Sequence, residues 1–244
     1  MFPLLVGTSG YGYKEWKGKF YPEKCPPQEM LGFYAKHFNS VEINNTFYHR
    51  PQAETLLTWA AQVPDNFIFT FKAPQVITHL KKLKNVNEEI EYLFRTLAVM
   101  GRKLGPVLFQ LPKSFRADLS VLEAFLDQIP DPQACAFEFR NPSWYNEEIL
   151  ALLELKGCCL CLADFDETPL IEIKSTATWG YLRFRRAEYS NSDLSQWGER
   201  IFSQKWARAF IFFKHEEEAI GPQTGLRFRK LISALQKKRG KAGT

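Results

Sequence analysis

The sequence predicts a single (β/α)8 barrel of the TIM type, and three observations lead to this prediction. Eight short apolar segments of strand character alternate with segments of helical periodicity along the 244 residues. Both the number of strands and the chain length are typical of this barrel. Most of the strands also end in a polar side chain, and barrel enzymes gather their sites at the carboxyl ends of their strands. A doubly wound open sheet is the alternative, but it explains the repeated polar ends less well.

The predicted strands are apolar runs, as expected of a parallel sheet that is covered on both faces. We expect them at residues 4–7, 40–44, 67–72, 105–112, 134–140, 158–164, 178–184 and 209–213, with irregularity around strands six to eight. In the fifth strand Phe137 and Phe139 alternate with Glu138 and Arg140, so the rings and the charges face opposite sides. A carboxylate and a guanidinium at the end of a buried strand are costly to desolvate unless they pair or bind a ligand.

Amphipathic segments between these strands predict the helices. Pro26 and Pro27 open the first helix, because proline is tolerated where the first turn lacks hydrogen-bond partners. Further helices are expected at about 52–63, 87–104, 119–129, 146–155, 197–206 and 226–235. No repeat or low-complexity linker indicates a boundary, so residues 1–244 are predicted to form one domain. Its basic end, Lys237 to Lys241, is expected to be a frayed, solvated tail.

Composition indicates an ordinary globular protein of the cytoplasm. Hydrophobic residues make up 45% and charged residues 24%, and the net charge is +5. No apolar run reaches the roughly 18 residues that a membrane span needs, and the apolar start at Met1 is too short for a secretory signal. The five cysteines, an odd number, fit reduced thiols. Cys158, Cys159 and Cys161 lie within an apolar strand and are interpreted as core thiols, not as a metal cluster.

Eight motifs, in order along nearly the whole chain, resemble those of the domain of unknown function 72, or YecE-like, family. They are Gly7-Thr8-Ser9-Gly10-Tyr11, Trp16-Lys17-Gly18, Phe20-Tyr21-Pro22, Val41-Glu42-Ile43-Asn44-Asn45-Thr46-Phe47-Tyr48, Phe71-Lys72-Ala73-Pro74, Thr78-His79, Phe109-Gln110-Leu111-Pro112 and Phe137-Glu138-Phe139-Arg140-Asn141-Pro142-Ser143-Trp144. The resemblance implies a TIM-type barrel, in agreement with the strand count, and it implies no agreed activity.

The chain departs from the family pattern near its C-terminus. In the seventh strand the family pattern is Tyr-x-Arg followed by His and Gly, whereas this chain has Tyr181-Leu182-Arg183-Phe184-Arg185-Arg186. The eighth strand of the family usually ends in a Phe-Asn-Asn-Asp-like turn, and here the turn reads Phe213-Lys214-His215-Glu216-Glu217-Glu218. Any role of those asparagines in the family is therefore not carried over to this chain.

Five cations are expected at the carboxyl ends of the strands: Lys72, Arg140, Arg183, Arg185 and Lys214. Backbone N–H groups of the glycine-rich loop Thr8-Ser9-Gly10 would add to their positive potential. Such a mouth attracts anions, and the arginines offer planar forks for phosphate or carboxylate. The loop is not followed at once by a helix, which argues against a dinucleotide site. A small phosphorylated or carboxylated molecule is the predicted ligand, and an enzyme acting on it is the leading hypothesis.

Acid–base chemistry is assigned to carboxylates at the same rim. Glu138 is the candidate general acid or base, because burial would raise its pKa while Arg140 would lower it. Glu42 and Asp164 are candidate partners, and His79 is either a site acid or a loop hydrogen-bonding group. Three carboxylates can hold Mg²⁺ or Mn²⁺, but the adjacent cations favour an internal ring of ion pairs, so no metal ligand is assigned.

Polar and aromatic side chains of the loops complete the predicted substrate contacts. They are Thr8, Ser9, Tyr13, Trp16, Asn44, Tyr48, Gln110 and Trp144. The aromatics are interleaved with Lys14, Lys17 and Lys19, so a module that binds single-stranded nucleic acid, with or without nuclease activity, is the alternative function. The same rings would also suit a packed lid over the barrel.

Overall fold

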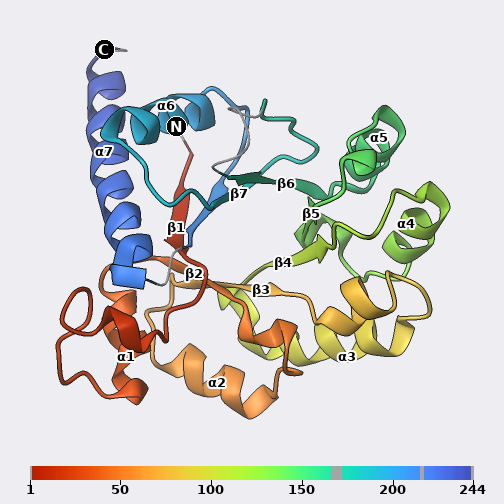
Figure 1. The fold of residues 1–244 in the computed structure, drawn as a ribbon, viewed down its shortest axis with the longest axis horizontal. Helices are drawn as coiled ribbons and strands as arrows, with labels where there is room; N and C mark the ends of the chain where they lie inside the picture. The colour runs from red at the N-terminus through yellow and green to blue at the C-terminus, as the bar shows by residue number, and fades with distance from the viewer. Residues whose placement is uncertain (1, 166–171, 215–216, 243–244) are drawn as a thin grey trace.

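The predicted barrel is present in the computed structural model, which describes residues 2–165, 172–214 and 217–242 (Figure 1). Eight parallel strands form one sheet in the order β1-β8-β7-β6-β5-β4-β3-β2. Their bounds are β1 (Leu4–Thr8), β2 (Ser40–Ile43), β3 (Ile68–Lys72), β4 (Leu104–Leu111), β5 (Cys135–Phe139), β6 (Cys159–Asp164), β7 (Gly180–Phe184) and β8 (Ala209–Phe213). Because all eight are parallel, their carboxyl ends meet at one rim.

Helices surround the strands in Figure 1 and cover the outside of the sheet. They are α1 (Pro27–Ala35), α2 (Ala53–Ala61), α3 (Asn87–Leu97), α4 (Leu119–Leu126), α5 (Glu147–Lys156), α6 (Asn191–Phe202) and α7 (Ile220–Ala242). Between β6 and β7 the described residues contain no helix, which is the irregularity of this part of the barrel. None of the helices that the structure describes has both the length and the apolar character of a membrane span.

Side chains close the seam between β1 and β2, where the two strands share only an isolated bridge. The Asn39 side chain accepts a backbone N–H of β1 at 2.8 Å and donates to a carbonyl of β1 at 3.0 Å. The Tyr34 hydroxyl accepts the Thr8 N–H at 2.7 Å and donates to the Ser40 carbonyl at 3.0 Å. A Cβ at Gly7 would overlap that carbonyl, so the seam requires glycine there.

The strands separate two apolar regions because successive side chains point to opposite faces. A small cluster fills the barrel interior and includes Leu108, Cys159, Cys161, Tyr181 and Phe212. A much larger cluster, with Cys158 among its members, packs the outer face of the sheet against the helices. All five cysteines are buried free thiols, as the sequence predicted. The same alternation turns Glu138 into the barrel and sends Phe137 and Phe139 to the helices.

Three predicted helices were wrong in their bounds, and one of them, expected over 226–235, is α7, which extends from Ile220 to Ala242. The helix expected over 87–104 ends at Leu97 and is followed by a 3₁₀ segment, η4 (Ala98–Lys103), which is kinked at Gly101 with a φ of 52°, before Leu104 begins β4. The helix expected over 197–206 is α6, which starts earlier at a capping box of Ser190 and Asp193. The backbone of the basic segment 237–241 is helical and forms the end of α7.

Candidate active site

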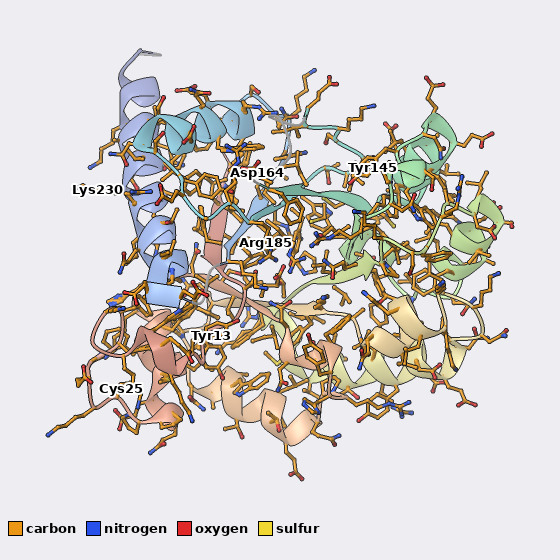
Figure 2. All side chains as sticks on the ribbon, in the orientation of Figure 1. Tyr13, Cys25, Tyr145, Asp164, Arg185 and Lys230 are labelled. Atoms are coloured by element: carbon orange, nitrogen blue, oxygen red, sulfur yellow. The ribbon has the colours of Figure 1, made fainter. Side chains whose placement is uncertain are left out.

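A pocket of about 780 Å³ opens at the carboxyl ends of the strands. Its size is that of a small-molecule site. The cations that line it are Lys72, Arg140, Arg183, Arg185 and Lys214, and Glu217 is the carboxylate among the described lining residues. In Figure 2 Arg185 lies near the centre of the ring of strands, whereas Cys25 and Lys230 lie at its periphery. The pocket is therefore central and strongly cationic.

Nine of the side chains expected to contact substrate line this pocket. They are Tyr13, Asn44, Tyr48, Lys72, Gln110, Arg140, Arg183, Arg185 and Lys214. Sequence reasoning missed Asn45, Phe47, Phe165 and Glu217. The first two belong to the polar and aromatic run after β2 that also holds Asn44 and Tyr48, so taking the whole run would have found them. Phe165 lies 4.4 Å beneath the Arg140 guanidinium, a contact between loops that no spacing in the sequence indicates.

The floor of the pocket is a buried network of ion pairs. Glu42 and Glu138 are 0% and 1% exposed. Arg183 lies between them, with Nη2 2.8 Å from Oε1 of Glu42 and Nη1 paired with Glu138. Arg140, at the edge of the pocket, also pairs with Glu138, and Arg185 Nη2 lies 3.4 Å from Glu42. The internal ion-pair alternative weighed from the sequence thus describes this floor.

The two glutamates are ionised at physiological pH. Burial raises the pKa of Glu138, but Arg183 and Arg140 outweigh it and lower the pKa from 4.5 to about 2. For Glu42, Arg183 and Arg185 likewise outweigh burial and lower the pKa to about 2. A group with such a pKa holds no proton to donate near pH 7 and is a weak base. Both carboxylates therefore hold Arg183 in place, and Glu138 is poorly suited to the acid–base role expected of it.

Several predicted contacts serve these carboxylates. Ser9 Oγ donates to Oε1 of Glu42 at 2.6 Å, and Asn44 Nδ2 donates to the same oxygen at 3.2 Å. Tyr181, which was not among the predicted contacts, donates its hydroxyl to Oε2 at 2.8 Å. Gln110 Nε2 donates to Glu138 at 3.0 Å. The Tyr181 hydroxyl reaches Oε2 of Glu42, the oxygen that the arginines leave open, and the other three donors add to oxygens that the arginines also contact. The buried charges are thus well supplied with donors, as a buried charge requires.

The glycine-rich loop after β1 is not the anion cradle that its N–H groups suggested. The Thr8 N–H donates to the Tyr34 hydroxyl at 2.7 Å, and the Ser9 N–H donates to the Phe213 carbonyl at 2.9 Å. The Gly10 N–H donates to the Glu42 carbonyl at 2.8 Å. All three donors are already bonded within the protein, to α1, β8 and β2, so the loop joins β1 to its neighbours.

Lys72 differs from the other cations of the pocket. It is the last residue of β3, and Nζ lies 3.7 Å from the centroid of the Phe47 ring. Within the described part of the chain its ammonium forms no ion pair or hydrogen bond. Burial and then the charge of Arg183 lower the pKa of Lys72 from 10.5 to about 8. A fraction of this amine is therefore neutral at physiological pH.

His79 lies beside the same aromatic ring. It belongs to a short π-helix, η3 (Val76–Leu80), and its ring packs edge-on against Phe47 at 4.8 Å. Its Nδ1 is 2.8 Å from the Thr78 hydroxyl, so the loop hydrogen bond weighed from the sequence is present. Burial and the charges of Lys72 and Arg140 lower the pKa of His79, which favours a neutral imidazole.

Asp164 belongs to a different cluster, at the base of α6. Its carboxylate accepts hydrogen bonds from Tyr189 OH at 3.0 Å and from Trp197 Nε1 at 3.2 Å, and it pairs with Arg186 at 2.8 Å. Burial raises its pKa. Asp164 is not among the lining residues of the pocket, and its contacts are those of an anchor between β6 and α6.

Three further predicted contacts are packing residues. Trp16 is 1% exposed and packs against Tyr13, Phe20 and Tyr21. Trp144 is fully buried and stacks on Phe139 at 4.9 Å. The Thr8 hydroxyl donates to the Gly10 carbonyl at 2.6 Å. Their side chains support the loops around the pocket from below.

The carboxylates do not fit Mg²⁺ or Mn²⁺. Within residues 2–165, 172–214 and 217–242, no group of three metal-ligating side chains comes together. Arginines already neutralise Glu42 and Glu138, and Asp164 is paired with Arg186 away from the pocket. His215, in the turn after the eighth strand, lies outside the described residues.

The fold and this pocket define a TIM-type barrel protein with a positively charged pocket at the carboxyl ends of its strands. The chain belongs to the family described as protein of unknown function DUF72, whose model matches residues 5–243. This confirms the resemblance that the sequence motifs indicated.

Relatives in sequence and structure agree with this assignment. The chain is 34% identical over 113 residues to the UPF0759 protein YecE of Escherichia coli K12, covering 46% of this chain and 42% of YecE. It is 29% identical over 167 residues to the UPF0759 protein YunF of Bacillus subtilis, covering 63% of this chain and 58% of YunF. The match thus spans about half the length of these relatives. A crystal structure of a DUF72 family protein of Thermotoga maritima superposes with a TM-score of 0.83 at 27% identity, covering 95% of this chain and 99% of that one.

Proposed function

We propose that this protein is an enzyme that acts on a small anionic molecule, bearing phosphate or carboxylate, in the pocket at the carboxyl ends of its strands. The observation that carries the proposal is the charge of the lining. Among the described residues, five cations stand against three carboxylates, Glu217 of the lining and the two glutamates of the floor, which leaves an excess of two positive charges. A concave site with this excess attracts anions and strengthens their hydrogen bonds.

The cations divide into structural and ligand-binding groups. Arg183 is 4% exposed and engages both floor glutamates, so it organises the site. The Arg140 side chain is 31% exposed and reaches the pocket from the loop after β5. Arg140 and Arg185 are the planar forks best suited to a phosphate or carboxylate, and Lys72 and Lys214 add point charges.

Proton transfer in this site falls to Lys72 and His79, not to Glu138. The pKa of Lys72 is about 8, near the range in which general acids and bases work. Burial and the neighbouring cations lower the pKa of His79, which keeps its imidazole neutral and able to accept a proton. Both side chains contact the Phe47 ring; Lys72 and Phe47 line the pocket, whereas His79 is next to that ring but is not among the described lining residues.

The nucleic-acid alternative has less support from the loop that suggested it. Trp16 and Tyr21 are 1% and 2% exposed, so their rings offer no stacking surface, and Lys19 pairs with Glu218. A cytoplasmic location remains our proposal, supported by the five buried free thiols.

Thermal melting in the presence of glycerol 3-phosphate, ribose 5-phosphate and 3-phosphoglycerate tests the proposal, with glycerol and ribose as uncharged partners. A ligand at a hundred times its Kd stabilises by ~2.7 kcal/mol, which raises the Tm by roughly 5–10 °C at this chain length. We expect such a shift with at least one phosphorylated compound and none with its uncharged partner.

Two variants place the binding site. Arg140→Ala should abolish the shift, and Lys156→Ala should retain it, because Lys156 is a cation on α5 that pairs with Asp127 away from the pocket. The proposal fails if no anion shifts the Tm, or if Arg140→Ala and Lys156→Ala behave alike.

A further inference from the structure

Lys72 occupies a position that none of the other lining cations shares. Lys72 is the last residue of β3 and its side chain lines the pocket. Its Nζ lies over the Phe47 ring, 3.7 Å from the ring centroid. Across the described residues no carboxylate lies within ion-pair distance of that amine. A half-buried lysine usually pairs with an acid, because an unpaired buried charge is costly. This one is held among cations instead.

Charged groups face Lys72 from four directions. Arg183 and Arg185 approach from β7, Glu138 from β5 and Glu42 from β2, and His79 shares the Phe47 ring. The glutamates would stabilise the ammonium, but their charge is directed to Arg183. Burial and Arg183 therefore prevail, and the pKa of Lys72 is about 8. At pH 7 roughly a tenth of the amine is neutral, roughly 300 times the fraction of an ordinary lysine.

We infer that Lys72 is a nucleophilic amine that condenses with the carbonyl group of an anionic aldehyde or ketone to form an imine in this pocket. The inference rests on the proposed function and names its substrate class, a carbonyl compound that also bears a phosphate or carboxylate. Lysines placed beside other cations in partly desolvated sites serve as imine-forming nucleophiles.

The chemistry balances without an oxidant or a reductant. The nitrogen lone pair of Lys72 attacks the carbonyl carbon, and the carbonyl π electrons move to oxygen, which takes a proton as nitrogen loses one. The hydroxyl group of the resulting carbinolamine takes up a proton and leaves as water while the nitrogen lone pair forms the C=N bond. This gives a protonated imine, and loss of the remaining proton from nitrogen gives the neutral imine. Amine and carbonyl thus give imine and water. His79, a neutral imidazole beside the same ring, is the neighbouring group that can carry the proton.

The pocket also provides for the anionic end of such a substrate. Arg140 and Arg185 line it together with Lys72, so one molecule can place its carbonyl at the amine and its anion at a guanidinium. The protonated imine draws electrons from the adjacent carbon, which makes a proton on that carbon easier to remove. The cations therefore select the substrate, and the amine activates it.

Three related probes test the inference on the full-length protein. Pyridoxal 5′-phosphate carries both an aldehyde and a phosphate, pyridoxal lacks the phosphate, and pyridoxine 5′-phosphate lacks the aldehyde. Borohydride added to each mixture delivers hydride to an imine and fixes it as a secondary amine, which peptide mapping by mass spectrometry locates. We expect pyridoxal 5′-phosphate to label Lys72 at least about tenfold faster than the exposed Lys14, because more of the Lys72 amine is neutral.

Variants and the matched probes distinguish imine formation at Lys72 from binding of an anionic substrate in the pocket. Lys72→Arg keeps the charge but cannot form an imine, so its label at position 72 should vanish, whereas Lys14→Arg should leave labelling of Lys72 unchanged. If both phosphates raise the Tm but Lys72 is not labelled, the imine is overturned and the anion site stands. If pyridoxal labels Lys72 as fast as its phosphate and pyridoxine 5′-phosphate does not raise the Tm, the imine stands and the anionic substrate falls. Labelling of Lys72 no faster than of Lys14, with no shift of the Tm, overturns both.

Discussion

Arg183 Nη2 lies 2.8 Å from Oε1 of Glu42, although the two residues are 141 positions apart in the sequence. The other terminal nitrogen of Arg183 pairs with Glu138, so one guanidinium joins the ends of β2, β5 and β7 beneath the pocket. Removal of one partner from such a buried network leaves an uncompensated charge. The ion pairs at the floor of the pocket therefore also contribute to the stability of the folded barrel.

The network predicts loss of stability in acid. Glu42 and Glu138 have pKa values of about 2 in the folded protein against an ordinary 4.5, so the unfolded chain takes up protons first as the pH falls. Their contribution is complete above about pH 4.5 and is lost between pH 4.5 and pH 2. The Tm measured from pH 7 to pH 2 should fall most steeply in that window.

Glu138→Gln should flatten this fall, because one of the two titrating carboxylates is gone. Glu123→Gln removes an exposed carboxylate of α4 and should keep the profile of the unchanged protein. A Tm that stays constant from pH 4.5 to pH 2 would show that the two glutamates are not held ionised in the fold.

The sequence predicted the fold well because its signals are local. Apolar runs at the strands, and polar residues such as Lys72 and Gln110 at their ends, follow directly from the alternation of a covered parallel sheet. The same signal found most lining residues of the pocket. Helix bounds were less secure where a helix gives way to a kinked segment, as α3 does to η4 with its kink at Gly101.

The partners of the charged residues could not be predicted, because they depend on contacts between strands. Glu138 and Asp164 look alike in the sequence, each at the end of an apolar strand. Glu138 points into the barrel and pairs with Arg183. Asp164 instead accepts hydrogen bonds from Tyr189 and Trp197 and pairs with Arg186. The sequence likewise could not show that the pKa of Glu138 would fall, since burial and ion pairing oppose each other.

Asp164 is predicted to stabilise the fold and not to bind the anion. Asp164→Ala leaves the buried Tyr189 hydroxyl and Trp197 N–H without their acceptor, which should cost about 2–4 kcal/mol and lower the Tm by roughly 5–15 °C. The Kd for an anion that binds the unchanged protein should stay within about twofold. Asp127→Ala, which breaks an exposed ion pair with Lys156, should change neither quantity appreciably. An unchanged Tm with a tenfold weaker Kd would instead assign Asp164 to the site.

Substitution of Trp16 distinguishes a packing role of its ring from a role in nucleic-acid binding. Because its ring is buried against Phe20 and Tyr21, Trp16→Ala should destabilise the protein by about 3–5 kcal/mol and lower the Tm by roughly 10 °C. Fluorescence anisotropy with a labelled oligonucleotide at low and high salt provides the second measurement. We expect weak binding that Trp16→Ala leaves unchanged, with Lys14→Ala as the exposed control on the same loop. The binding module would be favoured if Trp16→Ala kept the Tm and reduced a salt-dependent affinity.

The affinity for a phosphate should report the ionisation of Lys72. Above pH 7 the phosphate of glycerol 3-phosphate is largely a dianion and the molecule carries no other group that titrates below about pH 9, so the charge of this ligand stays nearly constant. As the pH rises through about 8, Lys72 loses its charge, and the Kd should rise about fivefold. Arg185, whose pKa is about 10, stays protonated over this interval. The Lys72→Met variant should have a Kd about fivefold higher at pH 7, and this Kd should not change up to pH 9. Lys214→Met removes another cation of the pocket and is the control, so its Kd should still rise near pH 8. If Lys72→Met retained the same rise, the titrating group would be elsewhere, and the neutral amine on which imine formation depends would lose its support.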